Sequence, residues 1–266
     1  MSTLAAAIEG LALLGPGLPD WALARAVLRG ERPYVHAPTA VPVPALLPPN
    51  ERRRSGLAVK IALAVGAAAL AQNARDASRI DTVFASSAAD GDTCHAICEQ
   101  LAGSERLISP TRFHNSVHNA PAGYWSIATR CMAPSTSLCG YDASFGAGLL
   151  EACAFLHAHG KPVLLVAYDA PYPEPLLAKR PVRDAFGLAL LLAPQAGAGA
   201  LARFELTLAD GAPDTLADAG LEALRRTVPT ARSLPLLGLL ARGERGAAVI
   251  EYLGGPHLAL QVAPCA

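Results

Sequence analysis

The stretch that decides the fold is residues 111–156, TRFHNSVHNAPAGYWSIATRCMAPSTSLCGYDASFGAGLLEACAFL. A polar segment rich in His and Asn leads to a compact strand at 135–140, and a tight turn then opens a helix of small residues at 143–156. Such a turn gathers unpaired backbone N–H groups at the positive end of the helix dipole, which is a favoured place for a nucleophile. The residue at this turn is Asp142, which at neutral pH is a poor acyl nucleophile.

Outward from this stretch, short apolar runs alternate with helical segments. Prolines between residues 31 and 50 exclude a helix there, because each removes a backbone donor and restricts the residue before it. Strands that alternate with helices favour an α/β layered fold, which we expect to be a single domain over residues 1–266. The predicted strands are 80–86, 162–168 (central and covered on both faces), 185–193, 203–209, 245–252 and 257–262, and the predicted helices are 57–72, 215–227 and one that begins near Thr93.

The central stretch resembles the N-terminal half of β-ketoacyl synthases, the condensing enzymes of fatty-acid and polyketide synthesis. Residues 118–123, HNAPAG, followed by Ser-Ile at 126–127, are similar to that family's Asn-Ala-Ala-Ala-Gly loop and the helix after it. Residues 133–137, APSTS, are similar to its Gly-Pro-Asn-Ser strand entry. The resemblance spans residues 55–195 and is strongest over 108–156.

The resemblance implies a truncated thiolase-like layered fold, with helices around a mixed central sheet and a shortened C-terminal part at 196–266. Carried forward without gaps, the register puts the family's nucleophilic cysteine at Asp142 and its closely packed helix at 146–148. The second half of the family, which carries two catalytic histidines, is expected to be missing. The implied relatives are the chain-length-factor proteins of aryl polyene pigment clusters, which pair with an active ketosynthase.

Asp142 therefore has two compatible interpretations. It plugs or tunes the position where an acyl thioester forms in the family, or it caps the N-terminus of the helix, for which Asp is a preferred residue. Neither role supplies a nucleophile, so we expect no catalytic residue and no condensing activity in this chain alone.

Two other side chains are alternative nucleophiles for an acyl-transfer enzyme or hydrolase. Cys139 lies three residues before Asp142; its alternative interpretation is a small buried hydrophobic residue. Ser144 lies in DASFG, which partly resembles the Gly-x-Ser-x-Gly turn of hydrolases but lacks the leading glycine. Cys94 and Cys98, with His95, lack the further ligand pair that a metal site needs, so no metal and no cofactor are expected.

Several polar and aromatic residues are candidates to line an acyl tunnel or a subunit interface. The histidines and asparagines have a second interpretation, in which they satisfy buried backbone groups. The aromatic residues have one too, as ordinary core, which would make the subunit a scaffold. The proline-rich residues 168–180 are predicted to form a pocket or interface loop. The candidates are Phe113, His114, His118, Asn119, Tyr124, Trp125, Tyr141 and Phe145.

The amino-acid composition limits the classes of partner that this chain is expected to bind. Hydrophobic residues make up 52% of the chain and charged residues only 17%, which indicates an unusually buried or partner-covered molecule. A net charge of zero gives no reason to expect nucleic acid, and residues 57–71 are too short and too interrupted by Lys60 to span a membrane. We expect a cytoplasmic protein with reduced cysteines, a full-length β-ketoacyl synthase as its partner in a heterodimer, and acyl carrier protein as an indirect partner.

Overall fold

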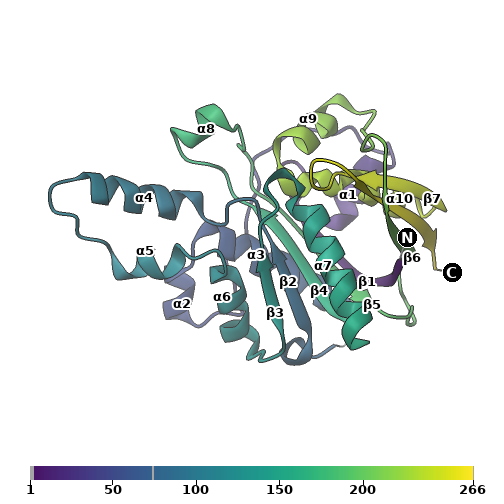
Figure 1. The fold of residues 1–266 in the computed structure, drawn as a ribbon, viewed down its shortest axis with the longest axis horizontal. Helices are drawn as coiled ribbons and strands as arrows, with labels where there is room; N and C mark the ends of the chain where they lie inside the picture. The colour runs from purple at the N-terminus through teal and green to yellow at the C-terminus, as the bar shows by residue number, and fades with distance from the viewer. Residues whose placement is uncertain (1–2, 74, 266) are drawn as a thin grey trace.

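The computed structural model describes residues 3–73 and 75–265, which form one mixed β-sheet with helices on both faces (Figure 1). The strand order is β3-β2-β4-β5-β1-β6-β8-β7. The strands are β1 (Leu4–Leu14), β2 (Asp81–Ala85), β3 (Ser135–Leu138), β4 (Val163–Asp169), β5 (Phe186–Ala193), β6 (Ala202–Ala209), β7 (Gly246–Ile250) and β8 (His257–Pro264).

The helices connect these strands and cover the sheet. The α-helices are α1 (Trp21–Leu28), α2 (Pro49–Arg54), α3 (Leu57–Leu70), α4 (Gly91–Ala102), α5 (Pro110–Asn115), α6 (Ala120–Thr129), α7 (Ser144–His159), α8 (Leu176–Lys179), α9 (Ala219–Thr227) and α10 (Leu234–Arg242). The 3-10 helices are η1 (Ala77–Arg79), η2 (Tyr141–Ala143) and η3 (Pro229–Ser233). Within the described residues, no helix combines the length and apolar character needed to cross a bilayer.

The two halves of the sheet differ in strand direction. β2 pairs in parallel with both β3 and β4, whereas the pairs from β4 through β5, β1, β6 and β8 to β7 are antiparallel. Because β2, β3 and β4 run the same way, their carboxyl ends meet at one edge of the sheet. The N-terminus of α7 follows β3 at that edge, so the fold gathers the loops of the central stretch there.

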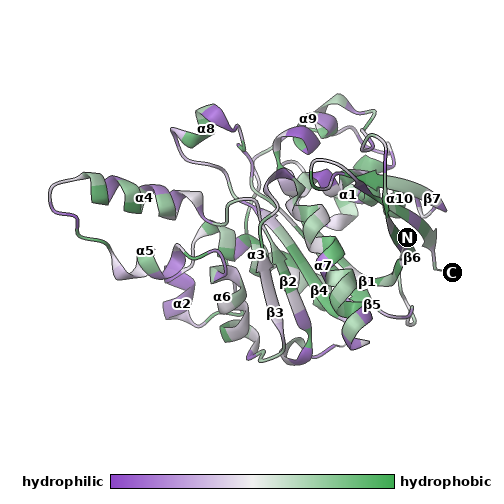
Figure 2. Ribbon diagram, in the orientation of Figure 1, coloured by the Kyte–Doolittle hydropathy of each residue, from purple (hydrophilic) through white to green (hydrophobic). Residues whose placement is uncertain are grey.

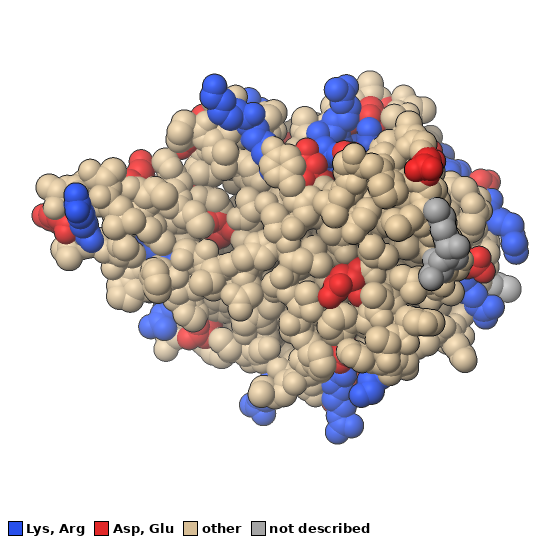
Figure 3. Space-filling view, in the orientation of Figure 1, with Lys and Arg blue, Asp and Glu red and all other residues tan. Residues whose placement is uncertain are grey.

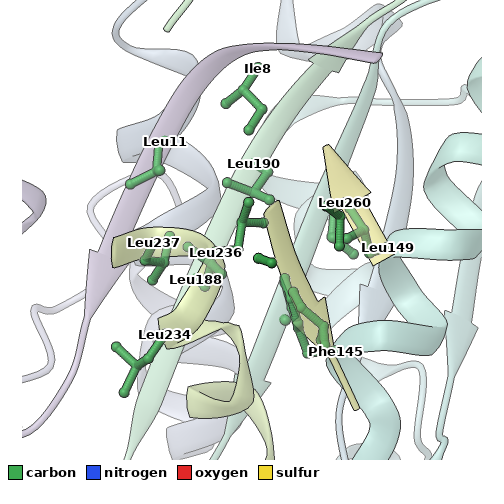
Figure 4. Packing of buried hydrophobic residues seen from close by; sticks show 14 of the residues in the cluster. Ile8, Leu11, Phe145, Leu149, Leu188, Leu190, Leu234, Leu236, Leu237 and Leu260 are labelled. Carbon is green, nitrogen blue, oxygen red and sulfur yellow. The ribbon is translucent and has the colours of Figure 1, made fainter. Parts of the chain in front are cut away.

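Two apolar layers hold the sheet. On one face, Phe145 and Leu149 of α7 and Leu236 of α10 pack against the sheet, where Leu188 and Leu190 of β5 lie (Figure 4). On the other face, α3 and α6 cover a second cluster of buried residues. Figure 2 shows the middle strands as mainly hydrophobic, and every residue of β4 and β5 is buried, which confirms the prediction of a central strand covered on both faces.

The small residues of α7 let it approach the sheet closely. A Cβ at Gly148 would lie 2.7 Å from the Cβ of Ala85 and 3.0 Å from Cδ1 of Leu165. A Cβ at Gly146 would lie 2.5 Å from the carbonyl oxygen of Glu251. The predicted close packing at 146–148 is therefore confirmed at both glycines.

The predicted strands are all present, with ends that differ by a few residues. The predicted helix at 215–227 is shorter and begins at Ala219, because the Asp218 side chain accepts from the N–H of Leu221 and caps it there. The proline-rich segment is extended as expected until α2, which begins at Pro49, where a missing N–H breaks no helical hydrogen bond. Helices α1 and α10 were not predicted.

Helices α4 and α5 form an arm that projects from the end of the sheet (Figure 1). No residue of α4 is buried, and α5 buries only Asn115. The Asp90 side chain caps α4 by accepting from the N–H of Thr93, which confirms the predicted helix start. We refer to residues 91–115 as the arm.

Candidate functional site at the carboxyl edge of the sheet

Asp142 is bound by two arginines. Its Oδ1 accepts a hydrogen bond from Arg180, and its Oδ2 lies 3.1 Å from Nη2 of Arg232. The other terminal nitrogen of Arg232 pairs with Glu251. Both guanidinium groups are largely buried, so these ion pairs are better shielded from solvent than surface pairs. The carboxylate therefore links the start of α7 to the loop after β4 and to η3.

The prediction that Asp142 caps α7 is wrong. The capping position is occupied by Ala143, no side-chain cap is formed there, and Asp142 lies one residue earlier in η2. The ion pairs explain the difference, because a carboxylate turned toward two guanidinium groups is not free to reach the helix amides. What remains of the sequence interpretation is a side chain that occupies the turn.

Ser144 is not placed to act as a nucleophile. It is fully buried, its hydroxyl donates to the carbonyl oxygen of Tyr141 at 2.7 Å, and it accepts from the N–H of Gly140 at 3.1 Å. Both bonds go to backbone groups of the turn, so the hydroxyl stabilises η2. This geometry disfavours the serine hydrolase alternative.

Cys139 is exposed, so the prediction of a buried small hydrophobic residue is wrong at this position. Its thiol donates to the carbonyl oxygen of Ser87 across a sulfur–oxygen distance of 3.1 Å. A catalytic cysteine needs a helix end or a cationic neighbour that stabilises its thiolate, whereas this thiol faces a backbone carbonyl group. The arrangement therefore gives the cysteine alternative no support.

A buried carboxylate lies beside this turn, at the end of β4. Asp169 is only 1% exposed and accepts four hydrogen bonds, from the N–H and hydroxyl of Ser87 (3.0 and 2.5 Å) and of Thr230 (2.7 and 2.6 Å). Burial raises the pKa of the Asp169 carboxyl, and the bonds from Ser87 and Thr230 oppose that rise. Asp169 therefore joins the loop after β2 to η3.

Arg180 lies between two aromatic rings. Its Cζ is 3.6 Å from the ring centroid of Tyr141 and 5.4 Å from that of Tyr172. The Tyr172 hydroxyl is 2.8 Å from Oγ of Ser87, so the stack is bonded to the Asp169 network. Burial raises the pKa of Tyr172, which keeps it a neutral donor or acceptor.

Sequence reasoning missed Arg180, Arg232 and Asp169 as members of this cluster. Asp169 carried a usable signal, because it directly follows an apolar run at the end of a predicted central strand. The segment that holds Tyr172 and Arg180 was predicted to form a pocket or interface loop, although no single residue in it was singled out. Arg232 had no local signal, since η3 reaches Asp142 only through the tertiary fold.

Of the polar residues near α5 and α6, His118 and its neighbour Asn115 each bond a backbone carbonyl group. Asn115 donates to the carbonyl oxygen of Arg54 at 2.6 Å and accepts from the Tyr124 hydroxyl at 3.1 Å. His118 Nε2 donates to the carbonyl oxygen of Leu138 at 2.9 Å. His114 packs edge-on against Tyr124, and Asn119 precedes α6 without a side-chain cap. The interpretation as partners of backbone groups fits Asn115 and His118.

The five aromatic candidates divide by exposure. Phe113 and Tyr141 are 65% and 61% exposed. Tyr124, Trp125 and Phe145 are buried in this chain's own core, and Trp125 packs against Gly66 of α3. Of these five, only Phe113 and Tyr141 are placed to contact another molecule.

Large apolar side chains are exposed along the arm, α6 and the turn beside β3. β3 is an edge strand, so one side of its backbone is unpaired within the described sheet. Figure 3 shows few charged side chains over the centre of the visible face. The exposed apolar side chains of this region are Leu101, Leu107, Phe113, Val117, Ile127, Met132 and Tyr141, and we call them the apolar face.

The cysteines and histidines of α4 do not form a metal site in the described residues. His95 pairs with Glu99 at 3.3 Å, and the thiol of Cys94 is directed to the carbonyl oxygen of Ser116. Across residues 3–73 and 75–265, no group of three or more His, Cys, Asp or Glu side chains is arranged to hold a metal ion. The cysteines at 94, 98, 131, 139, 153 and 265 are free thiols.

Comparison with known proteins gives a family. The family model described as "Beta-ketoacyl synthase, N-terminal domain" matches residues 28–241. No curated protein matches the chain.

Solved structures share the fold over almost the whole chain. A chain of the ketosynthase ApeO in complex with its chain length factor ApeC, from Xenorhabdus doucetiae, is 25% identical with a TM-score of 0.73, and the match covers 98% of this chain and 99% of that one. A chain of the ishigamide ketosynthase/chain length factor is 15% identical, with a TM-score of 0.71 and coverage of 99% and 100%. A β-ketoacyl synthase from Burkholderia phymatum is 14% identical, with a TM-score of 0.72 and the same coverage. The mixed sheet with helices on both faces is therefore the thiolase-like fold of ketosynthases, as the resemblance implied.

Proposed function

The chain belongs to the β-ketoacyl synthase family, and from this premise we propose that it is a non-catalytic chain-length-factor subunit. It pairs with an active β-ketoacyl synthase in polyketide or fatty-acid-type chain elongation, of the aryl polyene kind. The ketosynthase–chain length factor complex from Xenorhabdus doucetiae supports this pairing, because a chain of that complex matches almost end to end.

The observation that carries the non-catalytic role is the environment of Asp142. At the position that the resemblance assigns to the nucleophile, the side chain is a carboxylate paired with Arg180 and Arg232. A carboxylate held by two cations has its electron pairs engaged and is a still poorer acyl nucleophile. The nearby Ser144 and Cys139 are bonded to backbone carbonyl groups, so neither replaces it.

The partner surface follows from the apolar face. Exposed apolar side chains, together with an unpaired edge strand, are characteristic of a subunit interface. Met132, which is 93% exposed just before β3, is costly to leave in water. A full-length β-ketoacyl synthase that joins its own sheet at this edge would cover both features.

The exposed aromatic candidates, Phe113 and Tyr141, are the ones that can reach an acyl tunnel in the partner. A subunit without a nucleophile can set product length if a bulky side chain closes the far end of its partner's acyl channel. Phe113 and Tyr141 project from this chain, whereas Tyr124 and Trp125 would first have to leave their own core. Acyl carrier protein then meets this chain only by way of the ketosynthase that it docks on.

The test is co-expression with a full-length β-ketoacyl synthase from the same organism. We expect the two to co-purify as a heterodimer, and mass spectrometry after incubation with an acyl-carrier thioester to find the acyl adduct on the ketosynthase alone. An adduct on Cys139 or Ser144 of this chain, or turnover of a simple ester by this chain alone, would overturn the non-catalytic role. Separate elution of the two proteins would overturn the pairing.

A further inference from the structure

Tyr141 has an unusual backbone conformation for a bulky residue. Its φ is 55°, in the left-handed region, which favours glycine and is rarely adopted by large side chains. Its side chain nevertheless remains 61% exposed. The conformation is therefore not the result of burying the ring in this chain's core.

Neighbouring groups hold Tyr141 in this conformation. The carbonyl oxygen accepts from the buried Ser144 hydroxyl at 2.7 Å, and the ring stacks on the Arg180 guanidinium at 3.6 Å. Arg180 in turn donates to Asp142, whose other oxygen pairs with Arg232. The Ser144 hydroxyl thus holds the backbone of Tyr141, and the Arg180 guanidinium, itself paired with Asp142, holds the ring.

A second set of contacts anchors Arg180 from its other side. Tyr172 lies 5.4 Å from the guanidinium carbon and bonds Ser87 through its hydroxyl. Ser87 donates twice to the buried Asp169. The stack at the surface is therefore continuous with the bonded network at the end of β4.

We propose that Tyr141 is a contact residue for the partner ketosynthase, and that Asp142 and Arg180 are positioning residues that fix its ring. Strained conformations that the surroundings over-determine cluster at binding sites, and Tyr is enriched among the residues that dominate interface energies. On this proposal, Asp142, at the position that the resemblance assigns to the nucleophile, holds the Arg180 side chain that stacks on Tyr141. This inference rests on the proposed function, and it identifies the turn at Tyr141 as part of the surface that binds the ketosynthase.

The exposed ring also indicates the chemistry of the surface that it meets. One face of Tyr141 is occupied by Arg180, and the other face and the edge are apolar, with a hydroxyl at the tip. The matching surface is an apolar pocket of the ketosynthase with a hydrogen-bonding group at its end. Tyr141 belongs to the apolar face and lies three residues after the edge strand β3, so the ring and the strand can meet the same partner.

The decisive variant is Tyr141→Gly, measured in the full chain by titration with the β-ketoacyl synthase that co-purifies with the unaltered chain. Glycine adopts the left-handed conformation without strain, so the thermal midpoint should hold while the affinity falls by about fivefold or more. Tyr141→Phe, which keeps the ring, should lose less affinity than Tyr141→Gly. Unchanged affinity of Tyr141→Gly overturns the contact role and leaves the proposed function intact, whereas no binding by the unaltered chain overturns both.

The positioning role is tested without the partner. A fluorinated tyrosine at position 141 reports the ring environment by NMR, and Arg180→Gln or Asp142→Asn should shift and broaden its signal. Arg183→Gln, an exposed arginine of the same loop, is the matched control and should leave the signal in place. A signal that ignores Arg180→Gln and Asp142→Asn overturns the positioning role.

Discussion

The carboxyl edge of the sheet and the arm belong to one chain but satisfy their groups in opposite ways. At the edge, Asp169 accepts four hydrogen bonds and Asp142 is paired with two arginines. In the arm, α4 buries no residue, and Leu107 and Phe113 face outward. The buried charges at the edge are paired within this chain, whereas the arm leaves apolar side chains exposed to solvent.

This difference shows where the many hydrophobic residues of the chain lie. Part of its 52% hydrophobic content fills the two layers against the sheet, and part lies on the apolar face. Substitutions of the buried, hydrogen-bonded groups at the edge, such as Asp169, should therefore change the stability of the isolated chain. Substitutions in the arm should change association and leave stability nearly unchanged.

The largest stability effect is expected at Asp169. Asp169→Ala would leave the buried N–H groups of Ser87 and Thr230 without their acceptor, and each unsatisfied donor costs about 1–3 kcal/mol. We expect a loss of about 3–5 kcal/mol in the free energy of unfolding, measured by urea titration of the purified chain. The control is Asp76→Ala, which removes an exposed carboxylate that accepts from Ser78 and pairs with the exposed Arg79. A loss below about 1 kcal/mol at Asp169 would mean that the edge is not tightly bonded.

A smaller effect is expected from Gly148→Ala in α7. The added methyl would lie 2.7 Å from the Cβ of Ala85, so α7 or β2 must shift, and overpacking of this kind costs about 1–3 kcal/mol. Gly123→Ala in α6 is the matched control, because no atom lies within 4 Å of the added Cβ. Helix propensity should make that control neutral or stabilising by up to about 1 kcal/mol. Equal melting temperatures for the two variants would contradict the close packing of α7.

The same contrast separates what the sequence could predict from what it could not. Strands such as β4 and the small-residue helix α7 were predictable, because continuous apolar runs and glycine-rich helices are local consequences of burial. The family could also be predicted from the residues around β3 and α7, and the family model that matches residues 28–241 confirms it. Helix α10 was missed because its mainly apolar sequence, opened by a proline, lacks the polar face of a surface helix.

The site was only partly predictable, because its bonds join distant parts of the chain. Asp142 was predicted as a cap from its neighbours, whereas Arg180 and Arg232 reach it only after β4 and η3 are placed. Cys139 was predicted to be buried, but its place at the end of an edge strand leaves it exposed. For Tyr124 and Phe113, aromatic type alone could not separate core from surface.

The smallest stability effect, and the sharpest test of the comparison, is expected at Phe113 in the arm. Phe113→Gln replaces an exposed ring by a polar side chain of good helix propensity, so the free energy of unfolding should change by less than about 0.5 kcal/mol. If the arm belongs to the partner surface, affinity for the co-expressed ketosynthase should fall by about fivefold or more. Leu176→Gln in α8, another exposed apolar residue outside the arm, should alter neither quantity. Equal affinity for both variants would leave the arm without a partner role, whereas a large loss of stability at Phe113 would show that the arm supports the fold itself.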